Sequence, residues 1–236
     1  MLSAVASVHS SDWLHAMPLS ACGLRLSDEA VRIAVGLRLG LDICIPHTCP
    51  CGVLADAKGI HALSCRRSSG RLARHHAVND IVYRALTRAN IPSTKEPTGL
   101  VRSDGKRPDG LTLIPWLRGK CLAWDVTVVN PFASSYVNGT ALVPGGTAEL
   151  AAEKKVSKYS VLPDCYLFQP LAFETVGSIN SSAVSFFSEL GRRLHEASGD
   201  TRECAFIFQR MSIAIQRFNE VAFRGSFVVD FNNDDS

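Results

Sequence analysis

Apolar residues recur every three to four positions in several stretches of the chain, and this spacing predicts amphipathic helices. The predicted helices span residues 28–40, 71–89, 148–160, 181–197 and 202–223. Runs rich in β-branched and aromatic residues predict short strands at 92–96, 109–114 and 121–129, and another from 165 toward 173. The middle of the chain thus runs helix, three strands, helix, strand, an order that predicts an α/β layer with a mixed sheet.

Two aspartates stand in the apolar strands predicted at 109–114 and 121–129. Burying a charge is costly unless something pairs with it, so carboxylates are seldom placed there. If these strands form one hairpin with its turn centred on Leu117, paired residues have numbers that sum to 234, and Asp109 lies opposite Asp125. Two like charges that close need a proton or a cation between them. Mg²⁺, or Mn²⁺, fits carboxylate oxygens beside a substrate phosphate, so the pair predicts a metal-dependent nuclease.

Further residues could complete this site. Glu96 precedes the first of these strands. One interpretation is that it supplies a third carboxylate to the metal site; the alternative is that it is a surface acid before a proline. Thr127 stands where a lysine would complete an acid-x-lysine pattern. The replacements are Lys154, Lys155 and Lys158 on the following helix, where the last two share one face. A lysine there orients the attacking water or stabilises charge on the phosphate; otherwise these lysines are an ordinary exposed helix face.

The loop from residue 44 to 65 is dense in cysteine and histidine. Four of these residues have the spacing C-x-C-x9-H-x3-C and predict a structural zinc site: Cys49, Cys51, His61 and Cys65. Cys44 and His47 are possible substitute ligands, and a loop of reduced thiols is the alternative. The amino terminus has no charged start or long apolar stretch, so a signal peptide is not expected, and metal binding or buried thiols are favoured over disulfides. No apolar run reaches the 18 or so residues of a membrane span.

The chain has a net charge of +3, and its charged residues are distributed unevenly along the sequence. Residues 58–107 carry a net charge of +8, whereas residues 108–236 carry a net charge of −3. A basic stretch beside a carboxylate site suits a protein that cleaves a polyanion, although a solvated charged helix face would look similar. The candidate phosphate contacts are Arg66, Arg67, Arg71, Arg74, Lys106 and Arg107.

Polar side chains also lie on the helix predicted at 71–89. His76 and Asp80 are four residues apart and could form a hydrogen-bonded pair or reach the site together. A structural pair is favoured, because buried polar side chains generally find such partners.

Taken together, these residues resemble a known family. The stretch from Trp13 to Phe223 is similar to the carboxy-terminal part of site-specific non-LTR retrotransposon proteins, where a zinc knuckle precedes a restriction-like endonuclease of the PD-(D/E)XK superfamily. The matching pieces, besides the knuckle, are Arg74-His75 with Asn79-Asp80, Lys95-Glu96-Pro97, Lys106-Arg107-Pro108-Asp109, Trp124-Asp125-Val126-Thr127-Val128 and Lys155-Val156-Ser157-Lys158-Tyr159.

The resemblance implies an α/β (α+β) fold with an αβββαβ core. It implies nicking of target DNA in the nucleus, so that the exposed 3′ hydroxyl primes reverse transcription of the element RNA by a polymerase domain in cis. Asp109 and Asp125 would then hold the metal, and Lys155 and Lys158 would assist. The expected regions are a helical linker (1–43), a zinc knuckle (44–68), the endonuclease core (69–175) and a helical region with an acidic tail (176–236). A nucleic-acid-binding module that no longer cuts, or an inert relic, are the alternatives.

Overall fold

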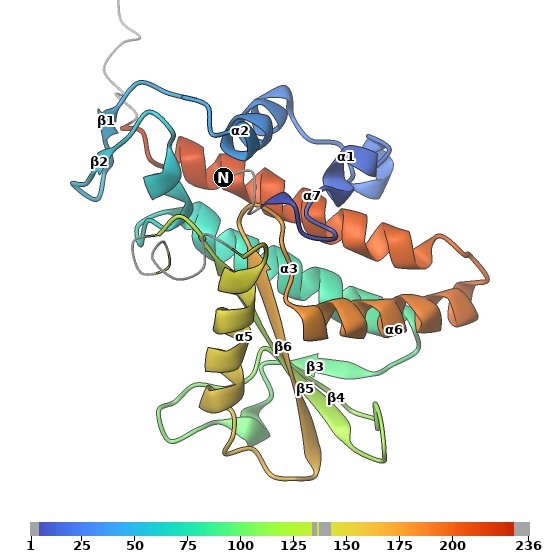
Figure 1. Cartoon of the computed structure of the whole chain (residues 1–236). Helices are drawn as coiled ribbons and strands as arrows, with labels where there is room; N and C mark the ends of the chain where they lie inside the picture. The colour runs from blue at the N-terminus through green and yellow to red at the C-terminus, as the bar shows by residue number, and fades with distance from the viewer. Residues whose placement is uncertain (1–4, 134–135, 137–142, 229–236) are drawn as a thin grey trace, which may run out of the picture.

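A mixed β-sheet occupies the lower part of the computed structural model as drawn in Figure 1. Within the residues that the structure describes, 5–133, 136 and 143–228, this sheet has four strands in the order β3-β4-β5-β6. The strands are β3 (Ser93–Lys95), β4 (Gly110–Thr112), β5 (Cys121–Val129) and β6 (Tyr166–Glu174). β3, β4 and β5 pair antiparallel and β6 joins β5 parallel, which confirms the predicted mixed sheet.

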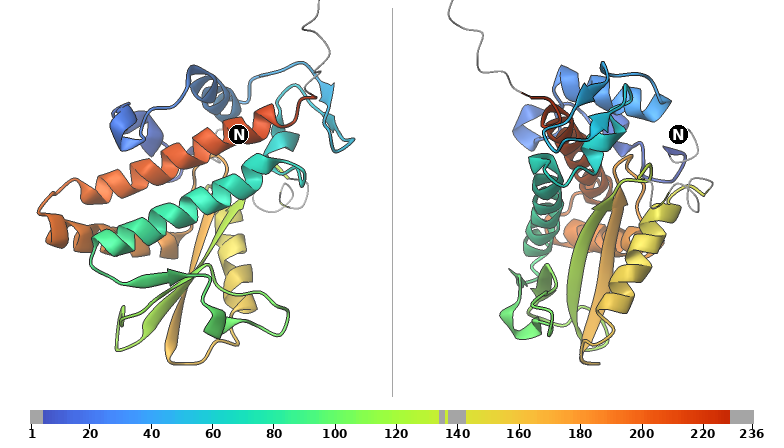
Figure 2. Two further views of the ribbon diagram at one scale, coloured as in Figure 1. Left: turned by 180° about the vertical axis from the view of Figure 1, so that it is seen from behind. Right: turned by 90° about the vertical axis from the view of Figure 1, so that its left-hand side faces the viewer.

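Helices cover both faces of this sheet. α3 (Ser69–Arg88), α6 (Ser181–Ser198) and α7 (Glu203–Arg224) contribute to one large core with β5 and β6. α5 (Gly146–Lys158) packs on the opposite face, as the edge-on view in Figure 2 shows. Because both faces of β5 are covered, its middle residues are buried without interruption, and successive side chains point alternately toward α3 and toward α5.

The large core fixes how β4 meets β5. The Trp124 side chain is wholly buried, and its indole nitrogen donates a hydrogen bond to Asn79 Oδ1 on α3 at 2.8 Å. Gly110 pairs with Trp124 across the sheet, and a Cβ atom at Gly110 would overlap the indole ring. Glycine is therefore required beside the tryptophan, and this close approach brings the preceding Asp109 next to β5.

The amino-terminal elements pack on α7. They are α1 (Asp12–His15) and α2 (Asp28–Leu39), and the short 3-10 helix η2 (Ser20–Cys22) lies between them in the chain. The Ser27 side chain accepts a hydrogen bond from the Ala30 amide at 3.1 Å, and Gly40 ends α2 with a left-handed conformation. These two residues satisfy backbone groups at the ends of the helix, and the helix predicted at 28–40 is confirmed.

The cysteine-rich loop lies beside the amino-terminal end of α3. It contains the two-residue strands β1 (His47–Thr48) and β2 (Leu54–Ala55), which pair antiparallel, and the 3-10 helix η3 (Ile60–Leu63). Another 3-10 helix, η4 (Thr98–Leu100), follows β3.

The predicted helices and strands are all present, with ends that differ by at most two residues. The hairpin register is also confirmed, since Gly110 pairs with Trp124 and Leu111 with Ala123. The predicted turn centre at Leu117 was wrong, because the turn lies at Arg118 and Gly119, between Leu117 and Lys120. The irregular residues 113–115 lengthen the first arm and shift the turn without changing the register of the strands.

Three further expectations concern the chain as a whole. The boundary between the core at 69–175 and a region at 176–236 stays a prediction, although α6 and α7 share one hydrophobic core with β5 and β6. Of the helices in the described part of the chain, none combines the length and apolar character needed to cross a bilayer. The acidic tail at Asp230, Asp234 and Asp235 lies outside the described residues.

Candidate functional site

Asp109 and Asp125 are both held at strand β5. Asp125 is in the centre of β5, and only 3% of it is exposed. Asp109 immediately precedes β4, and its Oδ2 accepts a hydrogen bond from the Val126 amide at 2.6 Å. The Val126 N–H lies past the residues of β5 that pair with β4, and the Asp109 side chain satisfies it in place of a strand. This hydrogen bond holds the Asp109 carboxylate against the β5 backbone, next to Asp125.

Two lysines of α5 reach the Asp125 carboxylate from the next layer. Lys155 forms a short ion pair with Oδ1, and Lys158 Nζ lies 3.8 Å from Oδ2. The lysines are three residues apart, so they share one face of the last turns of α5. Small residues bring this helix close to the sheet: Ala148, Ala151 and Ala152 pack against Ala172 of β6.

The surroundings of Lys158 are unusual for a lysine. Burial lowers its pKa, and the positive charges of Lys155, Lys106 and Arg102 lower it further, while Asp125 opposes them. Its Nζ donates to the hydroxyl of Tyr159 at 2.9 Å, and that hydroxyl donates to the Arg107 carbonyl oxygen at 2.7 Å. The pKa of Tyr159 is raised, mainly by burial. The buried Asp125 carboxylate therefore faces the two lysines of α5, and Lys106 and Arg102 add positive charge near Lys158.

His75 of α3 belongs to the same cluster, although sequence reasoning did not assign it there. Its Nε2 lies 3.2 Å from Asp109 Oδ1, and this hydrogen bond is the main reason that its pKa is raised. The sequence held a usable signal, because His75 is one helical turn before Asn79, the buried residue that binds Trp124.

The expected pair of His76 and Asp80 was wrong. Asp80 instead forms ion pairs with Lys95 at 2.7 Å and with Arg84. Strand β3 begins soon after α3 ends and brings Lys95 to this carboxylate, a long-range contact that helical spacing does not reveal.

Glu96 contacts Asp109 through its backbone and not through its carboxylate. Its amide donates to the Asp109 carbonyl oxygen at 3.0 Å, but its side chain is 57% exposed and forms an ion pair with Arg107. Glu96 has a positive φ of 48°, which ends β3 and turns the chain away from the sheet. Its role as a third metal ligand stays a prediction.

The proposed phosphate contacts differ in exposure. Arg66, Arg71, Lys106 and Arg107 lie at least partly at the surface, and Arg67 donates to the Pro50 carbonyl oxygen at 2.9 Å. The expectation for Arg74 was wrong, since this residue is 1% exposed. Its guanidinium donates to Asn219 Oδ1 at 2.6 Å and to the Leu63 carbonyl oxygen at 3.0 Å, so it joins α3 to α7 and to the cysteine-rich loop.

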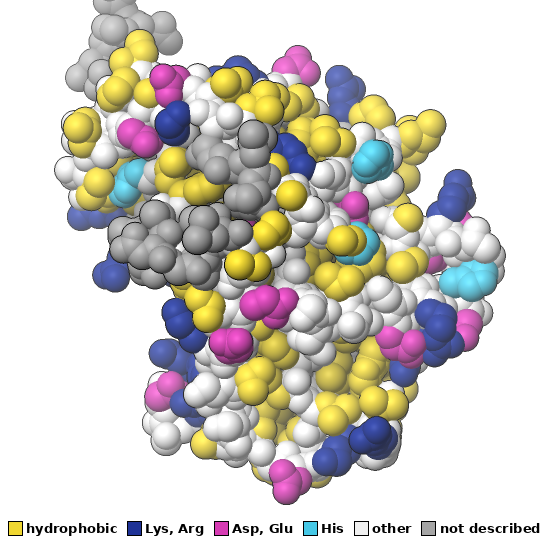
Figure 3. All heavy atoms as spheres, in the orientation of Figure 1, with side chains coloured by type: hydrophobic (Ala, Val, Ile, Leu, Met, Phe, Trp, Pro, Cys, Tyr) yellow, Lys and Arg dark blue, Asp and Glu magenta, His cyan; other side chains and the backbone are white. Residues whose placement is uncertain are grey.

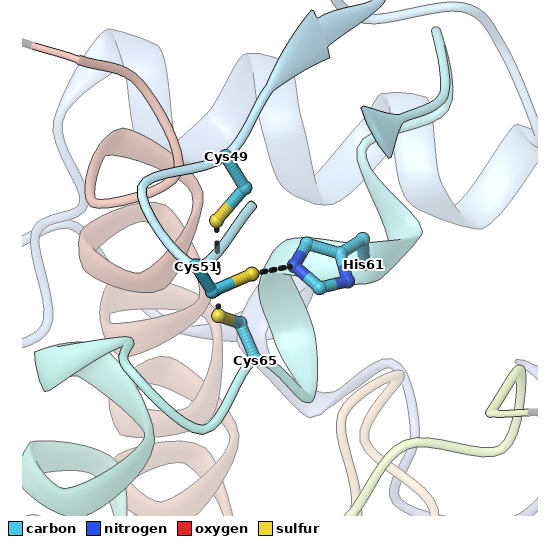
Figure 4. A group of neighbouring side chains, drawn as sticks. All are labelled: Cys49, Cys51, His61 and Cys65. Carbon is cyan, nitrogen blue, oxygen red and sulfur yellow. Dashed lines mark hydrogen bonds between the residues drawn. The ribbon is translucent and has the colours of Figure 1, made fainter. Parts of the chain in front are cut away.

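The cysteine-rich loop gathers four side chains into a compact cluster (Figure 4). The ligand atoms of Cys49, Cys51, His61 and Cys65 all lie within 4.8 Å of one another. The sulfur atoms of Cys49 and Cys65 are 3.7 Å apart, and Cys51 Sγ is 3.2 Å from His61 Nε2. Tetrahedral zinc with Zn–S bonds near 2.3 Å requires sulfur atoms about 3.8 Å apart. The cluster could therefore hold a metal ion such as zinc.

Local structure explains this convergence. The turn between β1 and β2 carries Cys49 and Cys51, and Gly52 allows it with a φ of 89°. The 3-10 helix η3 supplies His61, and Cys65 follows just before α3. The backbone N–H of Val53 is the main cause that lowers the pKa of Cys51 to about 6, which favours the thiolate that binds metals.

The two substitute ligands lie outside this cluster. Cys44 Sγ is 3.4 Å from the Asp56 carbonyl oxygen, and His47 Nε2 is 3.0 Å from Ser226 Oγ. His47 also stacks on Phe227, with ring centroids 3.9 Å apart. Its side chain thus fixes the loop to the residues that follow α7.

Among the described residues, this is the one group of three or more Cys, His, Asp or Glu side chains spaced for a metal ion. Asp109, Asp125 and His75 do not form such a group by themselves, so a cation held by the aspartates would need oxygen ligands from water or substrate as well. The chain matches no protein-family model and none of the curated proteins with which it was compared.

Proposed function

We propose that this chain is a Mg²⁺-dependent DNA endonuclease with a restriction-endonuclease-like αβββαβ core and a structural zinc ion in the Cys49/Cys51/His61/Cys65 cluster. The observation that carries the proposal is that Lys155 and Lys158 both reach the buried Asp125, while the Asp109 carboxylate is held on the amide of the next residue, Val126. Such a set provides hard oxygen ligands for a cation and positive charge for a phosphate.

The donor set fits a divalent cation such as Mg²⁺ or Mn²⁺. Carboxylate oxygens from Asp109 and Asp125 would hold it, and when bound it would supply a water of lowered pKa and charge for the phosphate. The Lys155 ammonium already neutralises Asp125, so it would turn toward the phosphate when the cation takes its place. Lys155 then stabilises charge that grows on the phosphate oxygens.

Lys158 has the better environment for orienting the attacking water. Its ammonium is anchored by the Tyr159 hydroxyl, which is itself fixed to the Arg107 carbonyl oxygen. Its lowered pKa makes this ammonium a better proton donor than that of an ordinary lysine. A lysine displaced to α5 thus takes the role that Thr127 cannot perform.

Substrate choice rests on charge. Arg102 and Lys106 contribute positive charge close to Lys158, and residues 58–107 together have a balance of +8. A positively charged surface around a carboxylate site attracts the phosphate backbone of DNA. The resemblance to non-LTR retrotransposon proteins extends the proposal to nicking of chromosomal DNA in the nucleus, beside a polymerase domain in cis and element RNA.

The test is nicking of a supercoiled plasmid with Mg²⁺, with Mn²⁺ and without added divalent metal. Asp109→Ala is expected to abolish nicking and to keep DNA affinity in a gel shift, because it removes a metal ligand and leaves the basic surface. Omitting Mg²⁺ is a better control than a strong chelator, which would also remove zinc. An Asp109→Ala protein that nicks at the wild-type rate would refute the proposal.

A second candidate is a nucleic-acid-binding module without cleavage. It is favoured by the ion pair of Lys155 with Asp125, which already satisfies this carboxylate without a metal. Binding of DNA together with Mg²⁺-independent, background-level nicking would support this alternative.

A further inference from the structure

The turn between β4 and β5 presents apolar side chains to solvent. We call residues 113–120 the hairpin tip; they run Leu113-Ile114-Pro115-Trp116-Leu117-Arg118-Gly119-Lys120. Leu113 is 58% exposed, Ile114 41% and Leu117 54%. In Figure 3, hydrophobic and basic side chains lie together at the lower end of the molecule, where Figure 1 shows this hairpin. Exposed leucines grouped at a turn mark a contact surface.

The hairpin tip is held rigidly. The Thr112 hydroxyl is buried, donates to the Ile114 carbonyl oxygen at 2.9 Å and accepts from the Leu122 amide at 2.9 Å. The Arg193 guanidinium of α6 stacks on the Trp116 ring at 3.8 Å and donates to the Trp116 carbonyl oxygen at 3.0 Å. A partner would meet preorganised apolar side chains, so little ordering is needed on binding.

The turn itself has an unusual residue. Arg118 has a φ of 51° and Gly119 a φ of 74°, so both are left-handed. Glycine or asparagine is preferred at the first of these positions, and arginine costs conformational energy there. Strain of this kind persists where a side chain is needed for function, which here points to the exposed guanidinium.

Charge identifies the partner. The hairpin tip has two cations, Arg118 and Lys120, and no acidic residue. An apolar centre flanked by cations complements a nucleic-acid duplex, whose stacked bases lie between phosphates. From Asp125 to the turn, β5 and the tip extend about 20 Å at roughly 3.4 Å per residue. About six base pairs of a duplex, at 3.4 Å each, match that length.

The geometry points to insertion of Leu117 between two base pairs of the DNA that occupies the aspartate–lysine site, with Arg118 and Lys120 on the neighbouring phosphates. This inference rests on the proposed function, because it places the same DNA at both sites. Apolar wedges of this kind unstack a base step and bend the duplex. The hairpin tip would thus deform DNA about six base pairs from the cut.

The test uses a duplex with 2-aminopurine at successive positions and Ca²⁺ in place of Mg²⁺, so that binding is observed without cleavage. The wild-type protein should raise the fluorescence at one step, and Leu117→Ser should bind while losing most of this rise. Leu54→Ser is the matched control, since Leu54 is an exposed leucine of β2. Unchanged fluorescence with Leu117→Ser would overturn the inference.

Arg118→Gly separates function from structure. The glycine relieves the strained turn, so the melting temperature should stay the same or rise, while DNA affinity falls several-fold and the salt dependence weakens by about one phosphate contact. A merely structural arginine would give unchanged affinity and would contradict the inference. Capture of the protein by phosphatidylserine vesicles, with the loss confined to Leu117→Ser, would also overturn it in favour of a lipid surface.

The two proposals fail differently. If the wild type unstacks DNA but never nicks it, the endonuclease assignment fails and the hairpin tip retains its role. If the wild type nicks DNA without unstacking it, the wedge inference fails alone.

Discussion

Removing the Lys155 ammonium tests whether Asp125 depends on a cation. Asp125 is 3% exposed, and Lys155 is its close partner. Breaking a buried ion pair by removing one partner costs about 3–5 kcal/mol. Lys158 remains 3.8 Å from the other carboxylate oxygen, and the Lys155 side chain is 23% exposed. We therefore expect Lys155→Met to lower the free energy of unfolding by about 2–3 kcal/mol, at or just below the lower limit of that range.

A double-mutant cycle isolates the pair. Asp125→Asn removes the buried charge, so the variant with both substitutions should be more stable than Lys155→Met alone, with a coupling of about 1–2 kcal/mol. The measurement is urea unfolding followed by circular dichroism, and equal denaturant slopes would show that the unfolded states are comparable. Strictly additive effects would refute the argument that Asp125 needs Lys155.

Measuring the stability of these variants with added Mg²⁺ tests whether the aspartates bind a cation. A cation that binds only the folded state raises its stability with concentration. Lys155→Met leaves Asp125 ready for a cation, so added Mg²⁺ should stabilise this variant more than the wild type, in which Lys155 competes. No Mg²⁺ effect on either protein would count against a metal site at Asp109 and Asp125.

Three further expectations follow from the geometry. Gly110→Ala should lower the free energy of unfolding by at least about 2 kcal/mol, because the added Cβ atom overlaps the Trp124 ring. Gly99→Ala is the control: Gly99 has open space around it, so this change should alter the free energy of unfolding by less than about 1 kcal/mol in the same urea assay. Cys51→Ser, or removal of bound zinc, should lower the melting temperature of the protein. Cys22 is an exposed cysteine outside the cluster, so Cys22→Ser should leave the melting temperature unchanged. Bound zinc is measured with a colorimetric chelator. Burial raises the pKa of Glu174 in the folded state, so this residue makes the protein more stable as pH falls from neutral toward the ordinary value of 4.5, and Glu174→Gln should show a flatter pH dependence of urea unfolding. An unchanged pH slope would contradict the last of these.

The sequence by itself determined the local elements and the hairpin register. Periodicity and capping residues are local properties, which is why α2 begins after Ser27 and ends at Gly40 as expected. The register follows from strand alternation: pairing Gly110 with Trp124 puts one apolar face on the core, and a shift by one residue would expose it. The convergence of the Cys/His cluster was also readable, because its ligands are close in the chain.

Only the tertiary structure decided which polar side chains meet. His75 rather than His76 reaches the aspartates, Arg74 is buried against α7, and the Glu96 carboxylate pairs with Arg107. Each outcome depends on how a helix is rotated, or a loop turned, against an element distant in the chain. Spacing along the chain does not specify that rotation; the packing of side chains such as Trp124 and Ala151 does.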